Sequence, residues 1–214
     1  MGNDRHGSEL HRPAYRIRTE RLLIRCFDPA DAPQLRAAID ELDLYLRPWI
    51  PWMRDEPQSL AQTVARLRNY RASFDLDRDY RYGIFDRSGA ELIGETGLYP
   101  RIGPGGLEIG YWIHQRHTGR GCAIEAAAAM VRIAFELERA TRLEIHCDPD
   151  NHASQGIPRR LGFRHEATLA RRSTDSENRV RDLMIWTLFA SEYAASAARH
   201  TSVAACDCTG VQLL

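Results

Sequence analysis

Apolar residues in this chain mostly follow strand-like patterns, which give way to helical spacing in a few separate stretches. The first strand-like stretch covers 15–26, where Leu22, Leu23 and Ile24 form an apolar centre ahead of a turn at Asp28-Pro29. Such runs predict β-strands. Further strands are expected ahead of the turn at 86–89 and at 92–98, 107–113, 142–147, 163–169 and 180–188.

Four stretches have the spacing or the start signals of helices. Asp31 is expected to cap the first helix, and Ser59 with Gln62 three residues later predicts a capping box at the start of the second. The third helix follows Gly121, and a short fourth helix covers 154–161.

The order of these elements is βααβββαβαββ, which predicts one mixed α/β domain. With 214 residues, of which 43% are hydrophobic, the chain can bury a single core of ordinary size. We expect a flexible segment at 1–13 and the folded domain at 14–190. The tail at 191–214 loses apolar periodicity after Ala198 and is expected to be disordered beyond one or two helical turns.

Charge and composition exclude several classes of function. Lys plus Arg and Asp plus Glu both total 29, so the net charge is zero and no diffuse attraction to nucleic acid or to an anionic membrane is expected. No apolar run approaches the roughly 20 residues of a membrane span, and the polar start lacks the apolar middle of a secretory signal, so a cytoplasmic location is expected. Five scattered cysteines suit a reducing compartment, and Cys206 and Cys208 alone do not predict a metal site.

The segment at 45–52 is expected to be a shaped loop, because Pro48 and Pro51 exclude a regular helix. Its aromatic residues Trp49 and Trp52 offer large contact surfaces. Two interpretations remain open: the tryptophans form a wall of an acceptor pocket, or they fill the core.

The strand at 107–113 leads into the third helix through Arg116-His117-Thr118-Gly119-Arg120-Gly121. The first amides of a helix lack internal partners and can bind phosphate oxygens, and the two glycines let an anion approach the backbone. Arg116 and Arg120 add positive charge, so a diphosphate is the natural ligand. The turn lacks the lysine of a Walker sequence and the three spaced glycines of a dinucleotide fold.

Arg116-x-x-Gly119-x-Gly121 resembles the cofactor-binding turn of the GNAT N-acetyltransferase superfamily. Four other segments are typical of its branch of ribosomal-protein N-terminal acetyltransferases, RimJ and RimL: the strand at 108–113, Asn151-x-x-Ser154 leading to Leu161-Gly162-Phe163, 19–25, and 48–52. Asp182 at the entry to the last strand is also typical of that branch. The resemblance covers about 15–190.

This resemblance implies a largely antiparallel mixed sheet flanked by helices and splayed between the fourth and fifth strands, 107–113 and 142–148. It implies acetyl-CoA as co-substrate and transfer of its acetyl group to a primary amine, on a protein N-terminus or a small molecule. The pantetheine arm would pair with the backbone near Ile113 as an added strand does. The implied cofactor contacts are Trp112, Ile113, His114, Arg116, Thr118, Gly119, Arg120, Gly121, Cys122 and Asn151.

Attack of an amine on a thioester needs a neutral amine, an oxyanion site and a proton for the thiolate. Ser154 stands where the family's proton donor comes near the sulfur, although helix capping is its alternative role. The base is open between Glu95, Glu108, His146 and solvent. RimL-type enzymes have been assigned a carboxylate at the position that is Ser173 here.

Several alternatives remain beside direct acetyl transfer. Cys122 stands at a helix N-terminus, where thiol pKa values fall, but it lacks a neighbouring base for covalent catalysis. The missing family carboxylate leaves a non-catalytic acyl-CoA sensor as the second hypothesis, and a nucleotide-phosphate binder is a third. A homodimer is expected, because the last strands of such domains often pair between subunits.

Overall fold

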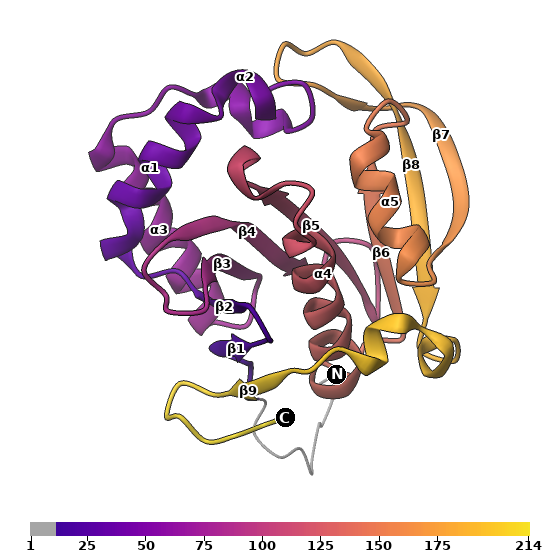
Figure 1. Ribbon diagram of the computed structural model, residues 1–214. Coiled ribbons are helices and arrows are strands. Elements are labelled where there is room, and N and C mark those ends of the chain that lie inside the picture. Colours follow the sequence, from indigo (N-terminus) through magenta and orange to yellow (C-terminus); the bar gives the residue numbers. More distant parts are fainter. Residues whose placement is uncertain (1–11) are drawn as a thin grey trace, which may run out of the picture.

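The computed structural model describes residues 12–214 as a nine-stranded sheet flanked by helices (Figure 1). The strand order across the sheet is β7-β8-β6-β5-β4-β3-β2-β1-β9. The strands are β1 Arg16–Arg18, β2 Leu22–Cys26, β3 Tyr80–Asp86, β4 Leu92–Tyr99, β5 Gly106–Ile113, β6 Arg142–Cys147, β7 Arg164–Thr174, β8 Val180–Phe189 and β9 Ala204–Cys206. All neighbours run antiparallel except β5 and β6, which confirms the predicted mixed and largely antiparallel sheet.

Five α-helices and several shorter turns connect these strands in the described part of the chain. The α-helices are α1 Ala32–Glu41, α2 Asp43–Leu46, α3 Leu60–Asp75, α4 Cys122–Arg132 and α5 His152–Arg160. The 3-10 turns are η1 Pro29–Asp31, η2 Pro51–Asp55, η3 Gln115–His117, η5 Tyr193–Ala195 and η6 Ala197–His200, and the π-helical turn η4 Ile133–Leu137 extends α4.

The two faces of the sheet belong to two apolar clusters. Ile109 and Ile113 lie in the cluster that contains the buried alanines of α4, whereas Trp112 lies in the cluster built around α1. Neighbouring residues of a strand point to opposite faces, so α4 and α1 cover different sides of β5. Helices therefore cover both faces of the sheet at β5. A ligand can reach the backbone of β5 only where a neighbouring strand separates from it.

That access is the gap between β5 and β6. Their parallel pairing covers only the first residues of each strand and ends at Glu108 opposite Glu144, although β5 continues to Ile113 and β6 to Cys147. The two strands diverge beyond that point, as the resemblance implied, because β5 and β6 are the fourth and fifth strands of the predicted order.

The predicted N-terminal caps of two helices can be compared with the structure. Ser59 and Gln62 form the predicted capping box at α3. Asp31 occupies the N-cap position of α1, as predicted, but its side chain makes no capping bond there. Asp28 caps the preceding turn η1 instead, because the Asp31 carboxylate is held by the guanidinium of Arg25 at 2.7 Å.

The tail is ordered rather than disordered beyond its first helical turns, which corrects the expectation for 191–214. It crosses the end of α4 and returns to the far edge of the sheet, where Ala204–Cys206 pairs with β1 (Figure 1). Ala198 and Ala205 are buried, so small residues that show no amphipathic pattern still pack closely. The Asp207 carboxylate accepts bonds from the amides of Thr209 and Val211 and shapes a turn.

The expected flexible segment at 1–13 falls almost entirely outside the described residues. Within 12–214, no helix combines the length and the apolar character needed to cross a bilayer.

Candidate functional site

The glycine turn, residues 116–121, joins β5 to α4 with two residues in left-handed conformation. Gly119 has φ +72° and Gly121 has φ +83°, which other residues adopt only at a cost. Gly121 is the N-cap of α4, and no side chain caps this helix. The first amides of α4 therefore point outward without an intrahelical acceptor, which is the geometry that binds a phosphate.

A partly exposed ionic contact between Arg21 and Glu125 holds the glycine turn. Arg21 donates from Nε to Glu125 Oε2 at 2.6 Å and from Nη1 to the carbonyl of Arg120 at 2.6 Å. Thr19 donates to the other oxygen of the same carboxylate at 2.6 Å. Arg21 and Thr19 thus hold Glu125 of α4, and the segment at 19–25 has a physical role in holding the turn.

The backbone amides just before the turn differ in whether they donate to β4. The His114 amide donates to Ile93 of β4 at 2.7 Å, so the alternation of an antiparallel ladder directs the Ile113 amide away from β4, toward the gap. The His114 ring is buried and accepts a bond from the Arg116 amide. The Arg116 guanidinium is 60% exposed and lies 3.7 Å from Glu41, which leaves it accessible to an anion.

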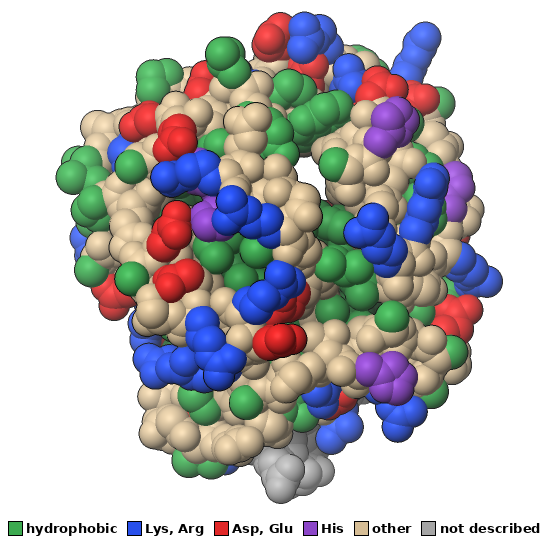
Figure 2. Space-filling model, viewed as in Figure 1, with side chains coloured by type: hydrophobic (Ala, Val, Ile, Leu, Met, Phe, Trp, Pro, Cys, Tyr) green, Lys and Arg blue, Asp and Glu red, His purple; other side chains and the backbone are tan. Residues whose placement is uncertain are grey.

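Figure 2 shows this side of the molecule hollowed between the part that carries α1 and the part that carries α5, with basic side chains around the hollow. Acidic side chains lie among the basic ones in the same view, so the charge around the hollow is mixed.

Ser154 and Asn151 meet at the first turn of α5. Asn151 is the N-cap, and its side-chain oxygen accepts from the Ser154 amide at 3.0 Å. Capping, the alternative role of Ser154, is therefore performed by Asn151. The Ser154 hydroxyl lies 3.2 Å from the hydroxyl of Tyr111 on β5.

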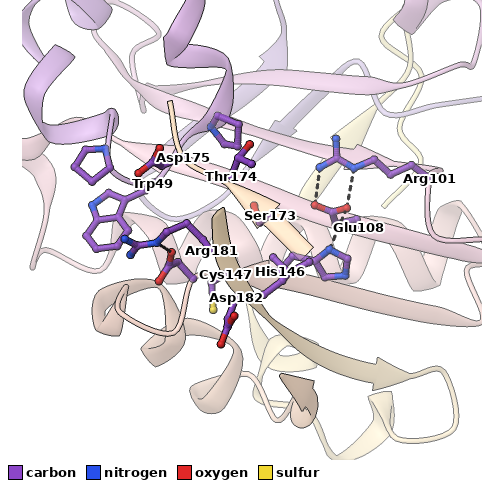
Figure 3. A pocket seen from close by; sticks show the side chains of 14 residues that line it. Trp49, Arg101, Glu108, His146, Cys147, Ser173, Thr174, Asp175, Arg181 and Asp182 are labelled. Carbon is purple, nitrogen blue, oxygen red and sulfur yellow. Dashed lines mark hydrogen bonds and ion pairs between the residues drawn. The ribbon is translucent and has the colours of Figure 1, made fainter. Parts of the chain in front are cut away.

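A cavity of about 340 Å³, the central pocket, opens beside the diverging strands (Figure 3). It is lined by Pro48, Trp49, Pro51, Arg101, Glu108, His146, Cys147, Asp148, Ser173, Thr174, Asp175, Arg181, Asp182 and Leu183. Two of the three candidate bases, Glu108 and His146, thus share one cavity, as does the serine at the family's carboxylate position.

His146 lies between two carboxylates near the wall of this pocket. Its Nε2 is 2.7 Å from Glu144, and its Nδ1 is 3.5 Å from Glu108. Arg101 holds Glu108 by two hydrogen bonds of 2.6 and 2.7 Å (Figure 3). A carboxylate on one ring nitrogen orients the imidazole, so that the other nitrogen can exchange a proton.

Glu95 is not part of the central pocket. It lies opposite Trp112 in the sheet and is buried, with Arg81 3.7 Å away. Burial raises the pKa of the Glu95 carboxyl, and the nearby positive charge of Arg81 only partly opposes this. A proton acceptor here would have to act beside Trp112, on the face of the sheet that α1 covers and outside the central pocket.

The two tryptophans of the 45–52 loop have different roles. Trp49 lines the central pocket, whereas Trp52 packs against the α1 cluster beneath the guanidinium of Arg66. Trp49 thus lies in a pocket wall and Trp52 against the core; that this pocket takes the acceptor stays a prediction. Arg54 joins this loop to the β7–β8 hairpin by donating to Thr174 and Asn178, which forms a bridge near the pocket.

Cys122 has the environment of a structural thiol. It is buried, and burial raises the pKa of its thiol despite the neighbouring arginines. This is the opposite of the shift that activates a nucleophile, so the geometry argues against covalent catalysis.

Sequence reasoning missed three side chains of the site. Arg101 orients Glu108, and Arg181 joins the loop after β6 by donating to Asp148 at 2.7 Å. Tyr111 contacts Ser154 across the gap. Alternation along β5 could have placed Tyr111 on the face that α4 covers, but nothing in the sequence placed α5 opposite it.

Comparison with known proteins agrees with this geometry. A family model described as an acetyltransferase (GNAT) domain matches residues 21–164. The probable N-acetyltransferase YjcK of Bacillus subtilis is 32% identical over 50% of this chain and 60% of its own length. The ribosomal protein uS5-alanine N-acetyltransferase of Escherichia coli is 29% identical over 72% of this chain and 80% of its own.

Solved structures share the fold. Mycobacterium smegmatis RimJ in complex with CoA-disulfide has a TM-score of 0.76 at 24% identity, covering 87% of this chain and 91% of its own. A RimL ribosomal L7/L12 alpha-N-protein acetyltransferase in complex with coenzyme A has a TM-score of 0.73 at 20% identity, covering 80% and 95%.

Proposed function

We propose that this chain, which belongs to the GNAT acetyltransferase family, acetylates the α-amine of a protein N-terminus. Its reaction is the transfer of an acetyl group from acetyl-CoA to an amine, so the open question is the acceptor. Relatives whose names specify the N-terminus of a ribosomal protein make ribosomal proteins the first acceptors to test. Such an acceptor would place the reaction in the cytoplasm.

The central pocket is the observation that carries this proposal. Its volume of about 340 Å³ is at the low end of ligand pockets, which span about 300–1,000 Å³. That volume suits the first residue of a peptide whose chain leaves through the opening, and it is small for a bulky polyamine or antibiotic. Trp49 and Pro51 supply an apolar wall for that residue's side chain.

We assign the base to His146. Glu144 holds Nε2 of the ring at 2.7 Å, and Nδ1 accepts the proton that the attacking amine loses. This arrangement compensates for Ser173, which cannot serve as the family's carboxylate. Ser154 supplies the proton for the CoA thiolate, and the Ile113 amide, directed into the gap, donates to the oxyanion.

The glycine turn binds the pyrophosphate in this assignment. The amides of Gly119, Arg120, Gly121 and Cys122 surround the anion, and the side chains of Arg116 and Arg120 add charge. The Thr118 amide donates to the carbonyl of Gln115 instead, so Thr118 is removed from the expected amide contacts. The side-chain nitrogen Nδ2 of Asn151 stays available for the pantetheine arm of acetyl-CoA, because the capping bond uses only the side-chain oxygen Oδ1.

An acceptor panel tests the function. Short peptides with a free N-terminus that differ in their first residue are compared with the same peptides blocked at the N-terminus and carrying an internal lysine, and with small polyamines and aminoglycosides. CoA release and product mass spectrometry should identify acetylation of free N-termini alone. Acetylation of the blocked peptides or the small amines would reject the proposed acceptor, and acetyl-CoA binding without release by any acceptor would favour the sensor.

A further inference from the structure

Two walls of the central pocket come from segments that lie far apart in the sequence. Trp49 and Pro51 belong to the aromatic loop, residues 45–56, and Thr174 belongs to the hairpin tip, residues 174–179. The tip of the β7–β8 hairpin lies beside the loop that follows α2 (Figure 1). The width of the pocket between these walls is therefore the distance between two separate segments.

Each of the two segments is fixed by its own hydrogen bonds. Arg47 donates to the carbonyls of Met53 and Glu56 at 3.0 Å, which closes the aromatic loop. The buried carboxylate of Asp175 accepts from the amide and from Nε of Arg179 at 3.0 and 2.7 Å, which shapes the hairpin tip. Because each segment has its own fixed shape, the width of the pocket depends on what joins the two.

Arg54 joins the two segments with all three nitrogens of its guanidinium. Nε donates to the Pro51 carbonyl at 2.8 Å, Nη1 to Asn178 Oδ1 at 2.8 Å and Nη2 to Thr174 Oγ1 at 3.1 Å. In the described part of the chain, no other hydrogen bond or ion pair links the aromatic loop to the hairpin tip. A planar guanidinium holds its donors in a fixed geometry, so this one side chain sets the distance between the two walls.

We propose that Arg54 is a positioning residue for acceptor selection: by joining Pro51 to Thr174 it keeps the pocket narrow, so that a small first residue of the acceptor fits and a large one is excluded. The inference rests on the proposed function, in which the side chain of the acceptor's first residue lies against Trp49. A pocket of about 340 Å³ leaves little room for a large side chain unless its walls separate.

The walls that Arg54 joins lie apart from the groups assigned to proton transfer. Figure 3 shows Trp49 and Asp175 at one end of the pocket, and Arg101 and Glu108 at the other end with His146. Loss of the Arg54 contacts should therefore change which acceptors fit, and it should not abolish the reaction.

The variant Arg54→Ala removes these contacts and retains every side chain that lines the pocket. Acceptor peptides that begin with alanine and with phenylalanine are compared by kcat/KM. A wider pocket admits the larger side chain, so the alanine-to-phenylalanine ratio of kcat/KM should fall about tenfold from its wild-type value. Arg68→Ala, at an exposed arginine of α3, is the control and should keep the wild-type ratio.

Asn178→Gly tests the same contact from the hairpin tip. Asn178 has φ +63°, which glycine adopts without strain, so this change removes an acceptor of Arg54 without a penalty to the backbone. The ratio should change in the same direction, and Arg54→Ala should add less in this background than in wild type. Independent effects of the two substitutions, an unchanged ratio in Arg54→Ala, or an equal loss for both peptides would overturn the proposal.

A second measurement does not depend on the acceptor. Trp49 is 36% exposed whereas Trp112 and Trp186 are buried, and Trp49→Phe supplies the fluorescence background of the other tryptophans. Arg54→Ala should increase the quenching of Trp49 by acrylamide, because the walls around it separate. Unchanged quenching would reject the inference, and failure to acetylate any peptide would reject the proposed acceptor without altering this readout.

Discussion

The glycine turn and the central pocket are built from different kinds of groups. The turn consists of backbone: two glycines with positive φ and a helix start without a side-chain cap. The pocket consists of side chains from the loop after α2, from β5 and β6, and from the β7–β8 hairpin. The turn comes from one short stretch of sequence, whereas the pocket requires segments more than 100 residues apart.

This difference separates binding from chemistry. Backbone amides offer the same donors whatever the side chains are. The turn therefore suits the pyrophosphate of acetyl-CoA, which is the same for every acceptor. The pocket's charged groups are mutually paired, as in Arg101 with Glu108 and Arg181 with Asp148. Changes there should alter the acceptor and the rate, while changes at the turn should alter affinity for acetyl-CoA.

The substitution with the largest expected effect on the pocket is at Glu56, which lies at the end of the loop that carries Trp49. Its buried carboxylate binds Arg36 and Arg66 at 2.5 and 2.6 Å. Glu56→Gln would leave two arginines without their shared partner and should lower the free energy of unfolding by about 3 kcal/mol at neutral pH, measured by urea denaturation.

The pH dependence of that loss is a further check. Burial alone would raise the pKa of Glu56, but the hydrogen bonds of Arg66 and Arg36 outweigh it and lower the pKa below the ordinary 4.5. A lowered pKa means that the contribution is present above about pH 4.5 and is lost as the pH falls through the folded value. The stability difference between wild type and Glu56→Gln should therefore shrink in acid; a constant difference would contradict this role.

His146→Asn should have the largest effect on catalysis. Loss of a general base lowers kcat/KM by about 100-fold, while calorimetry should find the affinity for acetyl-CoA unchanged. His165→Asn, on the exposed strand β7, is the control and should keep full activity. A wild-type rate in His146→Asn would return the role of base to Glu108, to Glu95 or to solvent.

Gly121→Ala tests the backbone nature of the turn. A side chain at φ +83° costs about 1–2 kcal/mol, and its Cβ would lie 3.0 Å from Arg21 Nη2. The turn should therefore relax away from its phosphate-binding conformation, and the dissociation constant of acetyl-CoA should rise about tenfold because binding must restore that conformation. At saturating acetyl-CoA, the KM for the acceptor should not change. Gly156→Ala, inside α5 with open space around its Cβ position, is the matched control and should not weaken binding.

Glu125→Gln should have the smallest effect of this series. It weakens the contact with Arg21, which is about half exposed, so about 0.5–1 kcal/mol and a few-fold loss of acetyl-CoA affinity are expected. The loss should diminish in high salt, because exposed ion pairs are screened. An equal loss in acceptor affinity would show that the turn and the pocket are not independent.

The sequence predicted the turn because everything that forms it is local: a strand, two glycines and a helix start. It could not distinguish the three candidate bases. Glu95, Glu108 and His146 all lie in predicted strands, and alternation alone does not tell which of them reaches the pocket. Glu95 pairs with Trp112 and Glu108 with Tyr99, so position along the strand, not the face, decides which one reaches the pocket. That position depends on strand register and on the place where β5 and β6 part, which are properties of the assembled sheet.

The tail was missed for a related reason. A strand of three residues in an alanine-rich segment has no period to detect, and only its partner β1 shows that it is a strand. The loop around Trp49 and Trp52 likewise received two interpretations because burial depends on which neighbours arrive from elsewhere.

β9 brings late residues of the chain against early ones. Ile17 lies opposite Ala205, so β1 is a paired strand instead of an open edge. A chain shortened at residue 190 would expose that edge as a template for other strands, and it would remove the Thr201 carbonyl that accepts from Arg132 of α4. Trimming this segment to aid crystallisation would therefore promote aggregation, and a tag at the C-terminus would have to leave the β1–β9 pairing intact.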